Sequence, residues 1–178
     1  MNIYILRHAS AGVRRPNPIL DKKRPLDKEG KSHCLHLAHI LNAMKVQFDL
    51  IVSSPLKRCM QTASLVGTET GYEASILTST ALAPEATLAQ FQKLLQECAG
   101  RENLLVVGHN PNLTAFLGSL LVPASAGAGA CLRLRKGSIA RVNLVRGPGT
   151  LQWMLGPGIV RALYATSTAK SRRKTSRK

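Results

Sequence analysis

The chain has 178 residues, which is enough for one domain with a complete hydrophobic core. Hydrophobic residues make up 44% of it, a share that is normal for a globular protein and excludes extensive disorder. The 25 Lys and Arg residues outnumber the 9 Asp and Glu residues and give a formal net charge of +16. A charge of this size favours anionic partners, but it does not choose among nucleic acids, membrane surfaces, acidic proteins and phosphorylated substrates.

The sequence contains no apolar run long enough to cross a membrane, and its first charge, at Arg7, comes too early for a signal peptide. We therefore expect a cytoplasmic protein without a membrane span. The spacing of the cysteines fits neither a disulfide framework nor a zinc site, so most are expected to be reduced and structural. Cys59 is the one whose thiolate the adjacent Arg58 could stabilise.

The first hundred residues alternate short apolar runs with amphipathic stretches. Asp27, Ser54 and Thr87 are the expected helix N-caps. The expected elements are a strand over 2–7, a Pro-rich loop over 9–25, a helix over 27–44, a strand over 49–52, a helix over 55–69, a short strand over 74–77, a loop over 79–86 and a helix over 87–98.

The remainder of the chain is richer in strands. Its expected elements are a strand over 103–107, a helix over 110–121, a chain break at 127–129, two strands over 132–135 and 138–145 joined by a turn at Lys136-Gly137, and a last strand over 151–155 in which Trp153 packs inward.

This order of elements predicts an α/β fold, a three-layer sandwich whose mainly parallel sheet has helices on both faces. The later strands are expected to add an antiparallel edge. We expect one domain over residues 1–160. Residues 161–178 are expected to form a basic, mobile tail, because their end is too polar and too charged to bury anything.

Three segments with basic or imidazole side chains are expected at one edge of the sheet, where the C-terminal ends of parallel strands meet. Arg7-His8 follows the first strand, Arg58 lies in the first turn of the helix after the second, and His109 follows the strand over 103–107. Guanidinium groups match the geometry of phosphate oxygens, and a helix N-terminus adds free N–H donors. Two Arg and two His around one tetrahedral anion indicate phosphoryl chemistry with a candidate imidazole nucleophile.

These segments resemble the motifs of the histidine phosphatase superfamily, which has the phosphoglycerate-mutase-like fold. Leu6-Arg7-His8-Ala9 resembles its RHG-type signature, with Ala9 in place of the common Gly. Arg58, within Ser-Ser-Pro-Leu-x-Arg-x-x-Gln-Thr-Ala, resembles its second arginine, and His109 resembles its second histidine. The resemblance covers roughly residues 1–155.

Within the superfamily the chain is most similar to SixA-type phosphohistidine phosphatases. It is short and lacks the long insertions of the mutases. Arg24-Pro25-Leu26-Asp27-x-x-Gly30 resembles the RPL-T-x-x-G pattern of SixA-type chains, with Asp27 in place of Thr. Both residues are competent N-caps, so the change is mild.

The resemblance implies a two-step phosphatase that needs no metal or other cofactor. His8 would attack the phosphorus in line, and water would then hydrolyse the phosphohistidine intermediate. Arg7, Arg58 and His109 would bind the phosphoryl group and stabilise its charge, which is why no metal is needed. The implied substrate is phosphohistidine on a signalling phosphotransfer protein, with small phosphate esters or other phosphoproteins as the alternative.

Three further residues have two interpretations each. Glu85 lies where the family often carries a general acid for an alkoxide leaving group, and is otherwise a loop charge. Arg24 is either a substrate contact at the rim of the site or a solvated loop charge. Ser10 either bonds a phosphate oxygen or shapes its loop.

A different class of function is a catalytically idle protein that binds nucleic acid or another polyanion. Aromatic residues are only 4% of the sequence, which argues against specific nucleic-acid binding. His33, His36 and His39 step round a helix without converging, so we expect them on a solvated face and not around a metal.

Overall fold

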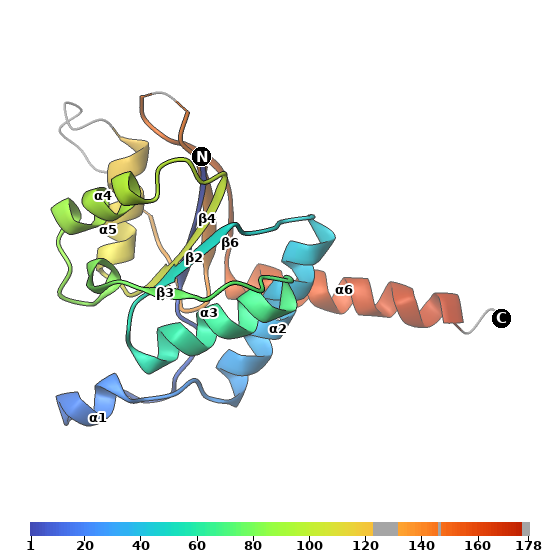
Figure 1. Cartoon of the computed structure of the whole chain (residues 1–178). Coiled ribbons are helices and arrows are strands. Elements are labelled where there is room, and N and C mark those ends of the chain that lie inside the picture. Colours follow the sequence, from blue (N-terminus) through green and yellow to red (C-terminus); the bar gives the residue numbers. More distant parts are fainter. Residues whose placement is uncertain (123–131, 146, 176–178) are drawn as a thin grey trace.

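The computed structural model describes residues 1–122, 132–145 and 147–175 and is built around one six-stranded sheet (Figure 1). The strands are β1 (Asn2–Arg7), β2 (Leu50–Ser53), β3 (Leu77–Thr78), β4 (Asn103–Gly108), β5 (Ile139–Asn143) and β6 (Thr150–Leu155). The helices are α1 (Pro18–Lys22), α2 (Lys28–Ala43), α3 (Lys57–Glu69), the 3-10 helix η1 (Thr80–Leu82), α4 (Leu88–Glu97), α5 (Asn112–Leu121) and α6 (Pro157–Thr175).

The sheet has the order β3-β2-β4-β1-β5-β6. The neighbours among the first four of these strands pair in parallel, whereas β5 is antiparallel to both β1 and β6. The predicted α/β fold, with a mainly parallel sheet and an antiparallel edge, is confirmed.

Helices cover both faces of the sheet, as predicted (Figure 1). Successive residues of a strand point to opposite faces, so β1 contributes Tyr4 and Leu6 to one core and Ile3 and Ile5 to the other. The first core also holds residues of α2, α3 and α6, and the second holds residues of α4 and α5. Burial on both faces explains why β1 and β4 are continuous apolar runs.

Two of the three predicted helix caps are confirmed. The Asp27 carboxylate accepts a hydrogen bond from the Gly30 N–H at 2.7 Å, and Thr87 forms a capping box with Gln90 at the start of α4. The prediction for Ser54 was wrong, because α3 begins at Lys57 with Leu56 in the N-cap position.

Two other local predictions were also wrong. The loop over 9–25 contains the short helix α1, which Asn17 caps by accepting hydrogen bonds from the next two N–H groups of the helix. Residues 132–135 form no strand, because β1 and β6 already occupy both edges of β5. The break expected at 127–129 lies outside the described residues.

The tail predicted over 161–178 is helical as far as Thr175, because α6 begins at Pro157 and continues through the expected boundary. The helix packs on the rest of the molecule near its start, where Val160 is fully buried and Tyr164 stacks on His36 of α2 with ring centroids 3.8 Å apart. That the end of the chain is a mobile tail stays a prediction. Figure 1 shows α6 running past α2 and away from the sheet. No helix among the described residues is long and apolar enough to span a membrane.

Candidate active site

The four residues singled out by the sequence motifs come together in one cleft. Arg7 pairs with Gly108 across the neighbouring parallel strands β1 and β4, so His8 and His109 follow at the same edge of the sheet. Arg58 reaches the same place from the first turn of α3. All four line a cleft of about 480 Å³, together with residues of the segment that carries α1.

His8 is buried and its tautomer is fixed by its neighbour. Its Nδ1 lies 2.8 Å from the carbonyl oxygen of Ala9. A carbonyl oxygen only accepts, so Nδ1 carries the proton and Nε2 keeps its lone pair. Burial lowers the pKa of His8 to about 4, and the nearby Arg58, Arg7 and Lys136 also lower it. At neutral pH the imidazole is therefore uncharged, which is the nucleophilic form.

His109 is also buried and is bonded through both ring nitrogens. Arg58 Nη2 lies 3.3 Å from its Nδ1, and Ser54 Oγ lies 2.9 Å from its Nε2. Because a guanidinium group only donates, Nδ1 is the acceptor and the Nε2–H donates to Ser54. Burial lowers the pKa of His109 to about 3, with His8 and the nearby guanidinium groups as further causes. The His8 and His109 ring centroids are 5.1 Å apart.

Ser54 was predicted as a helix cap, and its contact with His109 was missed. Its burial is complete, and its Oγ also accepts a weak hydrogen bond from the Leu56 N–H at 3.4 Å. The serine therefore orients an imidazole of the site instead of beginning α3. Its place directly after β2, at the strand edge where the histidines lie, was the available signal in the sequence.

Arg7 and Arg58 are held by protein oxygens but keep most of their donors. Arg7 Nη1 donates to the carbonyl oxygen of Leu134 at 2.8 Å, and Arg58 Nη1 donates to that of Asp21 at 3.0 Å. The Asp21 carboxylate lies 3.6 Å from Arg58 Nη1. A guanidinium group has five N–H donors, so both arginines can bind an anion without giving up these contacts.

Asp21 is a second residue that the sequence analysis missed. Its carboxylate lies 2.9 Å from Arg24 Nε, and Arg24 Nη1 donates to the carbonyl oxygens of Ala11 and Gly12 at 2.8 and 3.1 Å. Arg24 is largely buried, so the interpretation as a solvated loop charge was wrong. Arg24 lines the cleft and ties the segment after β1 to α1.

Ser10 and Glu85 differ in their relation to the cleft. The Ser10 hydroxyl donates to the Asp27 carboxylate at 2.6 Å and does not line the cleft, which agrees with a role in shaping its loop. Glu85 does line the cleft, beside Pro84, and its side chain is exposed. A general acid in contact with a leaving group needs such a position.

Lys136 and two arginines of the loop after β1 add positive charge that the sequence analysis did not assign to the site. Lys136 lies in the turn before β5 and lines the cleft, as do Arg14 and Arg15. Lys136 also contributes to the lowered pKa of His8. Its position depends on the pairing of β1 with β5, which no motif near Lys136 reveals.

Arg58 favours the Cys59 thiolate, as expected, but burial outweighs its effect. Burial raises the pKa of its thiol to about 12 although Arg58 is adjacent, so the group is a thiol and not a thiolate. Its Sγ lies 3.2 Å from His109 Nε2 and donates toward the Gly108 carbonyl oxygen at 3.6 Å. The buried Cys59 side chain thus packs against the His109 ring.

The prediction that His33, His36 and His39 lie on a solvated face is wrong for His33. This side chain is buried, because the turn before β5 covers it: its Nε2 donates to the Gly137 carbonyl oxygen at 2.8 Å. His36 is half-buried against Tyr164, and His39 is exposed. Within residues 1–122, 132–145 and 147–175, no three His, Cys, Asp or Glu side chains are grouped as metal ligands.

Comparisons with known proteins agree with the resemblance that the sequence motifs indicate. The family model described as histidine phosphatase superfamily (branch 1) matches residues 3–83. The phosphohistidine phosphatase SixA of Escherichia coli strain K12 is 28% identical over 160 residues, which cover 88% of this chain and 94% of that protein. An uncharacterised protein of Picosynechococcus sp. is 31% identical over 155 residues, 85% of this chain and 89% of that protein. A solved structure of the protein histidine phosphatase SixA complexed with tungstate is similar with a TM-score of 0.77 and 26% identity, and the match covers 88% of this chain and 97% of that chain.

Proposed function

Because the chain belongs to branch 1 of the histidine phosphatase superfamily, we propose that it removes phosphate from phosphohistidine on a signalling protein, through a covalent intermediate on His8. The observation that carries this proposal is the hydrogen bond from His8 Nδ1 to the Ala9 carbonyl oxygen. It leaves a neutral Nε2 lone pair in a cleft lined by cations, which is what a nucleophile toward phosphorus requires.

The substrate class is supported by the relatives. SixA of Escherichia coli is a phosphohistidine phosphatase, and the SixA structure is complexed with tungstate, an oxyanion of the same tetrahedral shape as phosphate. In this chain the corresponding anion would lie among Arg7, Arg58 and His8 at the end of the sheet.

The first step transfers the phosphoryl group to the protein. The Nε2 lone pair of His8 forms a bond to phosphorus in line with the bond that breaks, which joins phosphorus to the substrate imidazole nitrogen. That nitrogen keeps the electron pair, and because the other nitrogen of the substrate ring already carries a proton, the leaving group is a neutral imidazole. A protonated imidazole leaves far more readily than an alkoxide, so a phosphohistidine substrate makes a small demand on a general acid.

The second step returns the protein to its starting state. Water attacks the phosphorus of phosphorylated His8, the phosphorus–Nε2 bond breaks, and inorganic phosphate leaves. Arg7 and Arg58 stabilise the charge on the equatorial oxygens in both steps.

His109 and Arg58 act together in this scheme. A bound phosphate dianion favours the protonated form of His109, in which Nδ1 is a donor and no longer accepts from Arg58. The same proton therefore releases the Arg58 Nη2 group and adds an N–H donor at Nδ1, so that both side chains can bind the anion. Ser54 keeps the ring in place by accepting from Nε2.

The test is dephosphorylation of a histidine-phosphorylated phosphotransfer domain, beside an aryl phosphate, in the presence of a chelator. The wild-type protein should turn over the phosphodomain and carry an acid-labile phosphate label that His8→Ala loses. His39→Ala is the matched control, because this exposed histidine lies outside the cleft.

Other outcomes point to the alternatives. Turnover of the aryl phosphate alone would keep the role of His8 and move the substrate to small phosphate esters. Turnover of neither by a folded wild-type protein would reject the proposed chemistry. Polyanion binding that falls steeply with salt and survives His8→Ala would then support the binding function.

A further inference from the structure

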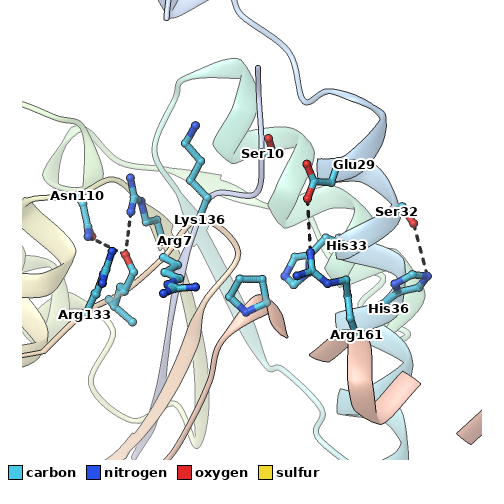
Figure 2. A pocket seen from close by; sticks show the side chains of 13 residues that line it. Arg7, Ser10, Glu29, Ser32, His33, His36, Asn110, Arg133, Lys136 and Arg161 are labelled. Carbon is cyan, nitrogen blue, oxygen red and sulfur yellow. Dashed lines mark hydrogen bonds and ion pairs between the residues drawn. The ribbon is translucent and has the colours of Figure 1, made fainter. Parts of the chain in front are cut away.

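A second cavity adjoins the catalytic cleft and is larger than it. Its volume is about 600 Å³, and it shares Arg7, Asn110 and Lys136 with the cleft. Figure 2 shows this cavity between the segment that carries Arg133 and the helix α2 that carries Glu29 and His33. We call it the basic groove, because five of its lining residues are Arg or Lys: Arg7, Arg133, Arg135, Lys136 and Arg161.

The wall of the basic groove is fixed to the catalytic arginine. Leu134 lies between Arg133 and Arg135, and its side chain is buried in the core shared with α4 and α5. Its carbonyl oxygen accepts hydrogen bonds from Arg7 Nη1 at 2.8 Å and from Asn110 Nδ2 at 3.0 Å (Figure 2). The side chains of Arg133 and Arg135 therefore extend from a backbone segment that is held in place by Arg7 and Asn110.

The basic groove has a strong excess of positive charge. Its one acidic residue, Glu29, lies 3.6 Å from Arg161 on the same side of the groove (Figure 2). Arg133, Arg135 and Lys136 are exposed, and no carboxylate of the described residues lies within 4 Å of them. These three cations are available to an anionic ligand.

The geometry points to the basic groove as the docking site for an acidic stretch of the protein substrate, next to the phosphorylated residue that enters the cleft. This inference rests on the proposed function. A small phosphate ester would fill the cleft and leave the groove empty, whereas a phosphorylated protein presents side chains on either side of its phosphoryl group. Carboxylates on these side chains would contact Arg133 and Arg135. Arg7 and Lys136 line both the cleft and the basic groove, so they could contact the phosphoryl group as well as the acidic stretch.

The chemistry of the walls favours an acidic protein over a nucleic acid. Single-stranded nucleic acids are bound by cations together with aromatic platforms on which bases stack. The residues that line the groove include no Phe, Tyr or Trp, and the His36 ring is already stacked on Tyr164. Charge complementarity at such a rim contributes to specificity and to the rate of association.

Two phosphohistidine peptides test the inference. They have the same length and differ in that one has Asp and Glu around the phosphohistidine and the other has Ser and Gly. We expect the wild-type protein to show a kcat/KM higher by about tenfold or more on the acidic peptide, and Arg133→Glu/Arg135→Glu to abolish this preference. Turnover of the neutral peptide and of an aryl phosphate should stay near the wild-type rate, because the neutral peptide has no carboxylates for Arg133 and Arg135 to bind and an aryl phosphate occupies only the cleft.

The matched control carries the same change of charge elsewhere. Lys93→Glu/Arg101→Glu alters α4 and the residues before β4, which are away from the strand ends that form the site, and should keep the preference. Equal kcat/KM for the two peptides in the wild-type protein would overturn the inference. So would an equal loss on both peptides in the groove variant.

A binding measurement distinguishes a failure of this inference from a failure of the proposed function. Anisotropy of the labelled, unphosphorylated acidic peptide should show weaker affinity in the groove variant and no change in His8→Ala. Binding with this pattern but without turnover would reject the phosphatase proposal and keep the docking site. Tight binding of a single-stranded oligonucleotide that the same charge reversal removes, with no preference between the peptides, would assign the groove to nucleic acid and overturn the inference.

Discussion

His33 Nε2 donates a hydrogen bond of 2.8 Å to the carbonyl oxygen of Gly137, 104 residues later in the chain. The N–H of the same glycine donates to the carbonyl oxygens of both Arg7 and His8 at 3.1 Å. A buried imidazole on α2 thus supports the turn before β5, and the turn supports the end of the strand that carries the candidate nucleophile. His33 takes no part in the proposed chemistry, but it helps to position Arg7 and His8, which do.

Gly137→Ala is expected to destabilise the protein by about 2 kcal/mol or more. The residue has φ +78°, and an added Cβ would clash with the His33 ring. Gly71→Ala is the matched control, because Gly71 also has φ +78° but has open space around it. Its loss should be about 1 kcal/mol. Urea denaturation of the two variants gives the comparison, and equal losses would show that the contact with His33 is not tight.

Arg58→Ala should reduce kcat/KM by roughly 10²–10³-fold, because it would remove a charged donor from the proposed binding site for the phosphoryl oxygens. Lys57→Ala changes an exposed neighbour in the same helical turn and should stay within about twofold of wild type. Steady-state kinetics with an aryl phosphate measures both. A rate near wild type in Arg58→Ala would remove this residue from the site.

The free energy of unfolding should fall as the pH is lowered from about 6.5 toward 4. Burial depresses the pKa of His8 to about 4 and that of His109 to about 3, while the unfolded chain takes up these protons near the ordinary pKa of 6.5. The unfolded state therefore binds more protons in this window, and stability rises with pH there. Since one pKa unit corresponds to about 1.4 kcal/mol, the loss should amount to a few kcal/mol.

The control for this pH dependence is His8→Asn/His109→Asn, measured by chemical denaturation at each pH. It should flatten the dependence between pH 6.5 and 4 and leave a smaller slope from His33, whose pKa burial also lowers. Asp21 and Asp27, whose carboxyl pKa values lie below their ordinary value, lose their stabilising contacts only at still lower pH. An unchanged slope in the double variant would mean that these imidazoles are not the source.

Glu85→Gln should affect substrates according to their leaving groups. We expect hydrolysis of an alkyl phosphate to slow by about 10²-fold or more, because an alkoxide needs a proton from a general acid. A phosphohistidine peptide should be turned over at nearly the wild-type rate. Single-turnover kinetics on both substrates gives the ratio. An equal effect on the two would assign Glu85 to substrate binding and not to proton transfer.

The elements of the site that could be predicted from the sequence are those set by local pattern. The apolar runs before His8 and His109 are strands because they are buried on both faces, and their parallel pairing places the two histidines together. Arg58 could be placed for the same reason, since the helix that carries it follows β2.

The elements that could not be predicted depend on contacts between distant segments. Asp21 meets Arg58 because the loop after β1 turns back onto α3, and no periodicity marks that return. The alternation of residues 132–135 resembles a strand, but the Leu134 carbonyl oxygen is bonded to Arg7 and Asn110 side chains instead of to a neighbouring strand. His33 is buried by the Gly137 turn, which is formed from the far end of the chain.

The pairing of β1 has a consequence for synthesis of the protein. This strand is synthesised before its two neighbours in the sheet, which are residues 103–108 and 139–143. A nascent chain therefore holds the candidate nucleophile His8 without its flanking strands until residue 143 has emerged. We therefore expect the proposed phosphoryl chemistry to begin only when translation has passed β5. A product truncated before residue 139 should be inactive even though it contains Arg7, His8, Arg58 and His109.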